Sequence, residues 1–173
     1  MVRAKPKGTG KSDVGAQSTP ATLAARRAGI AFSLHTYVPP SGGGSLSEDV
    51  ATAIGMPAEQ VFKTLVVTVD EQLTVGVLPV GSSLNLKALA STVGGKRGTL
   101  ANQAAAERAT GYVRGGISPL GQRRQLPIVV DGSALRHASI CVSAGRRGLQ
   151  LELSPVDLIR VAGARTGSIA AQV

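Results

Sequence analysis

Two segments of this sequence carry residues whose types and spacing could do chemistry. In residues 60–67, Lys63 stands near the start of an otherwise apolar run, where its charge could meet a phosphate or a carbonyl. A solvated lysine at a strand end is the alternative. In residues 110–122, four glycines and a proline surround Ser118. Such a loop can turn successive amides toward a carbonyl or an oxyanion, with an ordinary irregular loop as the alternative.

The usual catalytic side-chain sets are missing. The chain has two histidines, His35 and His137, and one cysteine, which do not form a zinc-binding pattern. There is no Walker-type or Rossmann glycine motif either. Cys141 lies in an apolar strand pattern, where a free cysteine is usually a small core residue, although pairing with a histidine stays open. We expect His35 to be structural, His137 to lie at the surface, and any activity to need no metal and no cofactor.

The composition predicts one cytoplasmic domain with an aliphatic core. Of 173 residues, 43% are apolar and only 2% aromatic, so Val, Leu, Ile and Ala must fill the core. No apolar run reaches the roughly 18 residues that a membrane span needs. The basic start of the chain lacks the apolar stretch of a signal peptide. A lone cysteine forms no internal disulfide, which favours a reducing compartment.

The charge favours a polyanionic partner. The net charge is +9, and residues 1–18 hold four basic residues against one acidic residue, so the rest of the chain is basic too. General solubility is the other explanation of this charge. Because aromatic residues are sparse, a nucleic acid would be held through its phosphates rather than by base stacking.

Turn and cap residues indicate the elements that position these segments. Residues 1–18 are predicted to be a disordered basic tail, residues 19–173 one domain, and residues 39–44 a loop. Helices are predicted to open at Ser18–Pro20, Ser47, Asn85, Asn102 and Ser154–Pro155, and to end near Gly29, Gly55, Val93, Gly111 and Val161. Strands are predicted at 32–37, 61–69, 73–80, 128–131, 139–143 and 149–153. This order indicates a single compact α+β domain with a mixed, largely antiparallel sheet.

Four segments resemble a known family, the YbaK/EbsC proteins. Phe62–Leu65, the 110–122 loop, Leu126–Asp131 and Val142–Leu149 occur there in the same order, and the likeness covers roughly residues 19–170. The family consists of free-standing trans-editing deacylases related to the insertion domain of bacterial prolyl-tRNA synthetase. The resemblance implies a barrel-like sheet surrounded by helices, acting on cysteine wrongly esterified to proline-specific transfer RNA.

The resemblance also implies roles for individual residues. Lys63 would meet the terminal nucleotide of the acceptor end, and Gly115 would contact the aminoacyl group through its backbone; these two are the expected catalytic residues. The expected substrate-binding residues are Tyr37, Leu46, Thr64, Tyr112, Gly116, Ile117, Ser118, Pro119, Ser143 and Gln150. The chain departs from the family at Leu46, often aromatic there, and at Gln150, often an Asp.

The missing nucleophile agrees with the mechanism of this family. The thiol of the bound cysteine attacks its own ester, giving a thiolactone and free transfer RNA; enforced intramolecular attack reaches effective molarities on the order of 10⁵ M. A related hydrolase for alanine on the same transfer RNA and a non-catalytic RNA-binding module are the alternatives. Prolyl-tRNA synthetase is an expected partner and a membrane is not, while the oligomeric state stays open.

Overall fold

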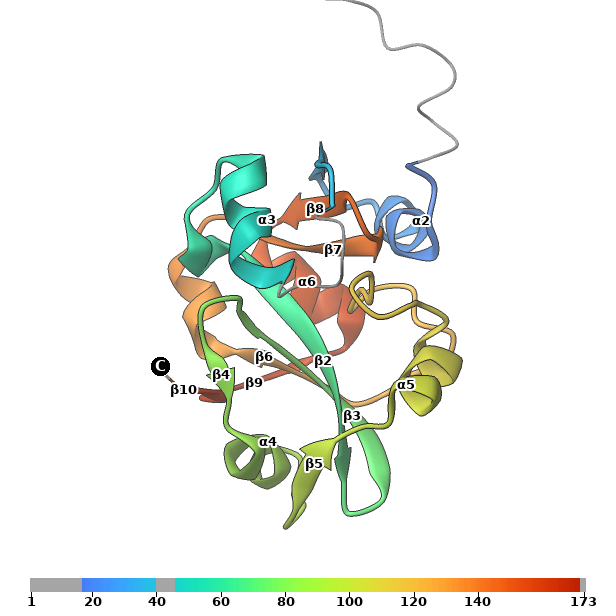
Figure 1. Ribbon diagram of the computed structural model, residues 1–173, viewed down its shortest axis with the longest axis vertical. Helices are drawn as coiled ribbons and strands as arrows, with labels where there is room; N and C mark the ends of the chain where they lie inside the picture. Colours follow the sequence, from blue (N-terminus) through green and yellow to red (C-terminus); the bar gives the residue numbers. More distant parts are fainter. Residues whose placement is uncertain (1–16, 40–45, 172–173) are drawn as a thin grey trace, which may run out of the picture.

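The computed structural model describes residues 17–39 and 46–171, with side chains in the second segment described from Asp49 on. The tail predicted for residues 1–18 and the loop at 39–44 therefore lie almost entirely outside the described residues. The described chain forms an α+β unit with three sheets (Figure 1). Its α-helices are α2 Pro20–Arg27, α3 Leu46–Ile54, α4 Leu86–Thr92, α5 Gln103–Thr110 and α6 Pro155–Ala162, and its 3-10 helices are η1 Ala58–Gln60 and η2 Gly132–Arg136.

The larger sheet has five strands and is mixed. Its order is β5 (Gly98–Leu100), β2 (Phe62–Val69), β3 (Gln72–Pro79), β6 (Ile128–Asp131) and β9 (Arg165–Gly167). The β2–β3 hairpin closes at Asp70 and Glu71, whose φ values of 45° and 73° are those of a two-residue hairpin turn. β6 lies parallel to both β3 and β9, so the parallel part of the sheet is larger than predicted.

The smaller sheet is antiparallel and has one apolar and one polar face. Its order is β1 (Phe32–Thr36), β8 (Leu149–Leu153) and β7 (Ile140–Arg146). Leu34, Leu151 and Val142 lie in register and pack into the main core. The alternate residues of the same strands are polar, and α3 packs over them through Val50 and Ala51, which lie in one cluster with Cys141. The two sheets meet where Val61 forms a parallel bridge with Cys141.

Three helices begin at predicted capping residues, whereas Ser47, predicted to open a helix, is the second residue of α3, and Ser154 precedes α6 without a side-chain capping bond. Thr19 forms a reciprocal capping box with Thr22, and the side chains of Asn85 and Asn102 accept hydrogen bonds from Ala88 and Ala105 amides. In Figure 1, α2 stands at one end of β7 and α3 at the other. The sequence analysis missed β5, β9 and the short pair β4 (Ser83–Leu84) and β10 (Ala170–Ala171). No helix among the described residues is long and apolar enough to cross a membrane.

Candidate functional site

Lys63 is the second residue of β2, and it pairs with Leu78 near the end of β3. Its side chain is half-buried, and Nζ donates a hydrogen bond to the carbonyl of Val80 at 3.4 Å. Val80 is flanked by Pro79 and Gly81, which both line a groove of about 740 Å³. The rest of that groove is lined by Ala58, Glu59, Ser82, Asp131, Gly132, Ser133, Arg136, His137, Ser168 and Ala170. Neither Lys63 nor Val80 is among the residues that line the groove, so the groove lies beyond the neighbours of Val80.

The polar face of the small sheet brings other predicted residues into one row. His35, Gln150 and Ser143 are direct cross-strand neighbours on β1, β8 and β7. Because Val61 and Cys141 pair in parallel, Lys63 and Ser143 each follow that bridge by two residues. The register therefore brings the lysine strand alongside Ser143 of β7, and Gln150 lies one strand farther away on β8.

Two side chains near this junction hold buried oxygens that no other described residue satisfies. Gln150 is only 6% exposed, and its Oε1 accepts no hydrogen bond in the described part of the chain. Oγ1 of Thr64, the residue after Lys63, is also buried and has no hydrogen-bond partner among the described residues. Buried polar groups are nearly always paired in folded proteins, so each of these unpaired oxygens is a candidate contact for a polar ligand.

The glycine loop is fixed against the β7–β8 turn. Gly115 has a φ of 86°, and the amide of Gly116 donates to the Val113 carbonyl at 2.9 Å. A side-chain carbon on Gly116 would lie 2.8 Å from Cα of Arg146, so only glycine permits this approach. Nε of Arg147 donates to the Arg114 carbonyl at 3.2 Å.

The other side of the same turn is held by Tyr37. Its amide donates to the Gly148 carbonyl at 3.0 Å, and its side chain is half-buried against the cluster beneath α3. Tyr37 and the glycine loop therefore meet the β7–β8 hairpin from two sides. Among the described residues, the amides of Gly115 and Ile117 donate to no carbonyl, which leaves them able to bind a ligand.

Several predicted substrate-binding residues shape the loop from within. Tyr112 is 4% exposed in the core, and its hydroxyl donates to the Leu120 carbonyl at 2.6 Å. Burial raises the pKa of this phenol. Ser118 is fully buried and its Oγ accepts from the Leu120 amide, while Ile117 packs against the main core and Pro119 is buried. The side chain of Leu46, the first residue of α3, lies outside the described part.

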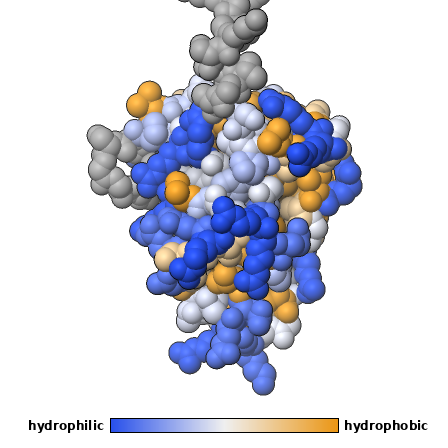
Figure 2. Space-filling model, turned by 90° about the vertical axis from the view of Figure 1, so that its right-hand side faces the viewer, coloured by the Kyte–Doolittle hydropathy of each residue, from blue (hydrophilic) through white to orange (hydrophobic). Residues whose placement is uncertain are grey.

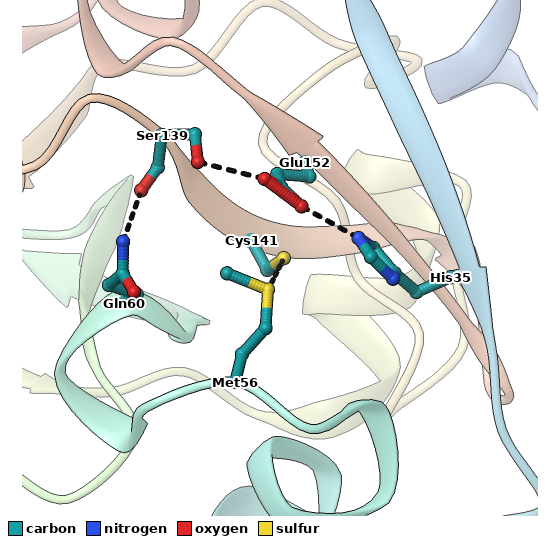
Figure 3. A network of polar contacts seen from close by, with 6 residues as sticks. All are labelled: His35, Met56, Gln60, Ser139, Cys141 and Glu152. Carbon is teal, nitrogen blue, oxygen red and sulfur yellow. Dashed lines mark hydrogen bonds and ion pairs between the residues drawn. The ribbon is translucent and has the colours of Figure 1, made fainter.

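Cys141 is fully buried, as predicted, at the centre of a network that sequence reasoning missed (Figure 3). His35 Nε2 lies 2.8 Å from Oε1 of Glu152, and Ser139 Oγ donates to Oε2 of the same carboxylate at 2.8 Å. These hydrogen bonds, that of His35 first, hold the pKa of Glu152 below its ordinary value. His35 lies on β1, Glu152 on β8 and Ser139 just before β7, so no spacing in the sequence predicts that they meet. His137, predicted at the surface, is half-buried and lines the groove of about 740 Å³.

A basic groove lies on another face of the molecule. It has a volume of about 350 Å³ and is lined by Leu73, Ala105, Arg108, Ala109, Arg123 and Arg124. Among the described residues, none of the three arginines forms an ion pair with a carboxylate. Figure 2 shows the side of the molecule turned toward α5, where hydrophilic residues surround small apolar patches. Unpaired guanidinium groups at such a groove suit phosphate binding.

Comparison of the sequence with known proteins identifies a family and individual relatives. Residues 43–161 match the family of the aminoacyl-tRNA editing domain. An Enterococcus faecalis protein described as a candidate Cys-tRNA(Pro)/Cys-tRNA(Cys) deacylase, EbsC, is 37% identical over 125 residues, which are 71% of this chain and 76% of that protein. The multifunctional Ser/Thr-tRNA deacylase ProXp-y of Escherichia coli K12 is 29% identical over 119 residues, 68% of this chain and 71% of that protein.

The fold also matches solved structures. A crystal structure described as a candidate trans-editing enzyme for prolyl-tRNA synthetase has a TM-score of 0.77 and 21% sequence identity. The match covers 89% of this chain and 98% of that one. At this identity the likeness shows a common fold, which confirms the predicted α+β class.

Proposed function

The chain belongs to the aminoacyl-tRNA editing domain family, and from that premise we propose that it releases cysteine wrongly esterified to proline-specific transfer RNA. The name of the Enterococcus faecalis relative supports this choice of amino acid and transfer RNA. The observation that carries the proposal is the junction of Lys63 with Ser143 and the unpaired oxygens of Thr64 and Gln150. A polar ligand bound there would satisfy both oxygens.

The substrate is the best source of the nucleophile. The protein's own thiol, Cys141, is fully buried, and burial followed by the charge of Glu152 raises its pKa to about 12. A protonated buried thiol is inert as a nucleophile. In the proposed step the substrate sulfur bonds to the ester carbonyl carbon, the bond from that carbon to the ribose oxygen breaks, and the thiol proton passes to the ribose oxygen. The products are a cyclic thiolactone and free transfer RNA.

The residues at the junction and in the glycine loop suit three tasks in that step. The ammonium of Lys63 would neutralise the phosphate of the terminal nucleotide and hold the leaving ribose in place. The amides of Gly115 and Ile117 would stabilise the developing oxyanion, a contribution that is worth about 3–4 kcal/mol per donor in other acyl-transfer sites. The Oε1 atom of Gln150 would accept a hydrogen bond from the α-ammonium of the aminoacyl group, in place of a carboxylate.

The basic groove gives the transfer RNA a second contact. Arg108, Arg123 and Arg124 would bind phosphates of the acceptor stem, each adding to the salt dependence of binding. We propose that residues 19–173 form the editing domain and that the tail at 1–18 adds only non-specific affinity, so its deletion should flatten the salt dependence. A prolyl-tRNA synthetase complex would select the transfer RNA, and such a substrate places the protein in the cytoplasm.

The decisive experiment is a deacylation panel over Cys, Ala, Ser and Pro esters of proline-specific transfer RNA. We expect fast release of cysteine only, with a thiolactone as the product. Release of alanine or serine at a similar rate would assign a water-dependent hydrolase, because neither can form a thiolactone. If the affinity for transfer RNA falls steeply with salt but no ester is released faster than in buffer, the protein is an RNA-binding module without deacylase activity.

Lys63 is tested separately within that panel. Lys63→Ala should lower the rate of cysteine release by at least about 100-fold, as expected for loss of a substrate-positioning charge. Lys87→Ala is the matched control, because Lys87 is exposed on α4 and should leave the rate unchanged. Full activity of Lys63→Ala would refute its proposed role.

A further inference from the structure

Three side chains that can bind a metal ion converge on the polar face of the small sheet. They are His35 on β1, Cys141 on β7 and Glu152 on β8, and their ligand atoms all lie within 4.8 Å of one another. Cys141 and Glu152 are direct cross-strand partners, and His35 reaches Glu152 from the neighbouring row. Figure 3 shows the three side chains pointing toward a common space, with Met56 facing Cys141 from the segment after α3.

We propose that this cluster is a binding site for a zinc-like divalent cation. Thiolate, imidazole and carboxylate form one of the donor combinations that zinc prefers, with bonds of about 2.3 Å to sulfur and about 2.0–2.2 Å to nitrogen and oxygen. Three atoms within 4.8 Å of each other can all lie about 2–3 Å from one central ion. Small side-chain rotations therefore suffice to bring them to bonding distance.

Zinc usually has four ligands, and the position left open by the three side chains faces Met56. Its Sδ lies 3.1 Å from the Cys141 Sγ, close enough to join the ion or to exclude bulk water from it. Thioether is a weak ligand for zinc and a better one for soft ions such as Cu(I). The carboxylate of Glu152 favours the harder divalent ion, so we assign zinc rather than copper.

The surroundings of the cluster resemble the support of a metal site. Ser139 Oγ donates to Oε2 of Glu152, which leaves Oε1 facing His35 and the common space. Nε2 of Gln60 in turn donates to the Ser139 carbonyl at 3.2 Å. Such partners fix the orientation of a ligating carboxylate. His35 and Glu152 are 29% and 26% exposed, so an ion can enter from solvent although Cys141 is buried.

The charges and protons of the site also balance. In the metal-free protein Cys141 is a free, buried cysteine with a proton on its sulfur. Binding forms a metal–sulfur bond and releases that proton to solvent. The thiolate and the Glu152 carboxylate then cancel the two charges of the ion, with neutral His35 as third ligand.

The test uses the full-length protein after removal of metals with a chelator. Titration with Co²⁺ should produce the near-ultraviolet absorption of a thiolate–cobalt bond, saturating at one ion per chain. Competition with Zn²⁺ should abolish that absorption and show tighter binding. His35→Ala and Glu152→Gln should each weaken Zn²⁺ binding by at least about 10-fold, since each removes one ligand. His137→Ala is the matched control and should leave the affinity unchanged.

Two results would overturn the proposal. One is saturation with Co²⁺ that leaves the thiolate absorption absent, which would place the ion elsewhere. The other is Zn²⁺ affinity that His35→Ala and Glu152→Gln both leave intact while circular dichroism shows each variant folded. Because deacylation is not the readout, failure here would leave the proposed editing function untouched.

Discussion

Replacing Gln150 with leucine should make the protein more stable while it removes most of the activity. Gln150 is 6% exposed, and its Oε1 has no hydrogen-bond partner among the described residues. A buried polar atom without a partner costs about 1–3 kcal/mol. Leucine removes that atom at similar volume and adds apolar burial. We expect Gln150→Leu to raise the free energy of unfolding by about 1–2 kcal/mol.

The gain is measurable by urea unfolding. Because the chain has no tryptophan, far-ultraviolet circular dichroism is the suitable signal. A gain of this size moves the midpoint upward by roughly 0.5–1 M urea at an unchanged slope. Release of cysteine from proline-specific transfer RNA should fall by at least about 10-fold, because the α-ammonium loses its acceptor.

A second glutamine provides the control. Gln60 already uses its amide, since Nε2 donates to the Ser139 carbonyl at 3.2 Å. Gln60→Leu deletes that bond and should therefore lower the free energy of unfolding by about 0.5–1.5 kcal/mol. The reasoning fails if Gln150→Leu lowers the urea midpoint as Gln60→Leu does, or if it leaves cysteine release at the wild-type rate.

Three further changes test the framework around the site. Gly116→Ala forces a carbon to within 2.8 Å of Arg146 Cα, so it should displace the glycine loop and lower cysteine release by at least about 10-fold in steady-state assays. Tyr112→Phe deletes the hydroxyl bond to the Leu120 carbonyl and should cost about 1 kcal/mol in urea unfolding. Asp131→Asn weakens a carboxylate that accepts from two backbone amides of the C-terminal segment and from a serine, at a cost of about 2–4 kcal/mol. Burial acts to raise the pKa of Asp131, but these bonds outweigh it and hold the folded pKa below 3.8. Its stabilisation is therefore full above pH 3.8 and lost as the pH falls through the folded pKa, so unfolding midpoints of wild type and variant should converge in acid.

Turn and cap residues predicted most helices and strands, but they did not predict which distant strands pair with one another. The Asp70–Glu71 turn and the Asn caps act within a few residues, so the sequence alone located the β2–β3 hairpin and the starts of α4 and α5. β9 has three residues, of which Arg165 and Thr166 are exposed, so no hydrophobic pattern marks it. Its position depends on parallel pairing with β6 instead.

The candidate site was likewise predictable where it depends on local sequence and not where it depends on contacts between distant segments. The Lys63 segment and the glycine loop were visible because unusual residue types cluster there. Tyr112 was predicted to bind substrate from the family resemblance alone. In the structure its ring packs against Gly145, whose φ of 101° and missing side chain leave the space. That accommodation joins two distant segments, so a single sequence does not reveal it.

The polar face of the small sheet explains why a site exists at this place. Strand β8 buries Leu151 and Leu153 on one side, while Gln150 and Glu152 project from the other, beneath α3. A fully aliphatic second face would bury more apolar surface and leave no oxygen unpaired, so selection for stability alone would favour it. Glu152 is paired with His35 and Ser139, but Oε1 of Gln150 has no partner among the described residues, so retaining Gln150 there costs stability that a bound ligand would restore. Gln150 and Glu152 are two residues apart on β8. The pairing of β8 with β1 and β7 would therefore position both a cation at Glu152 and an aminoacyl group at Gln150.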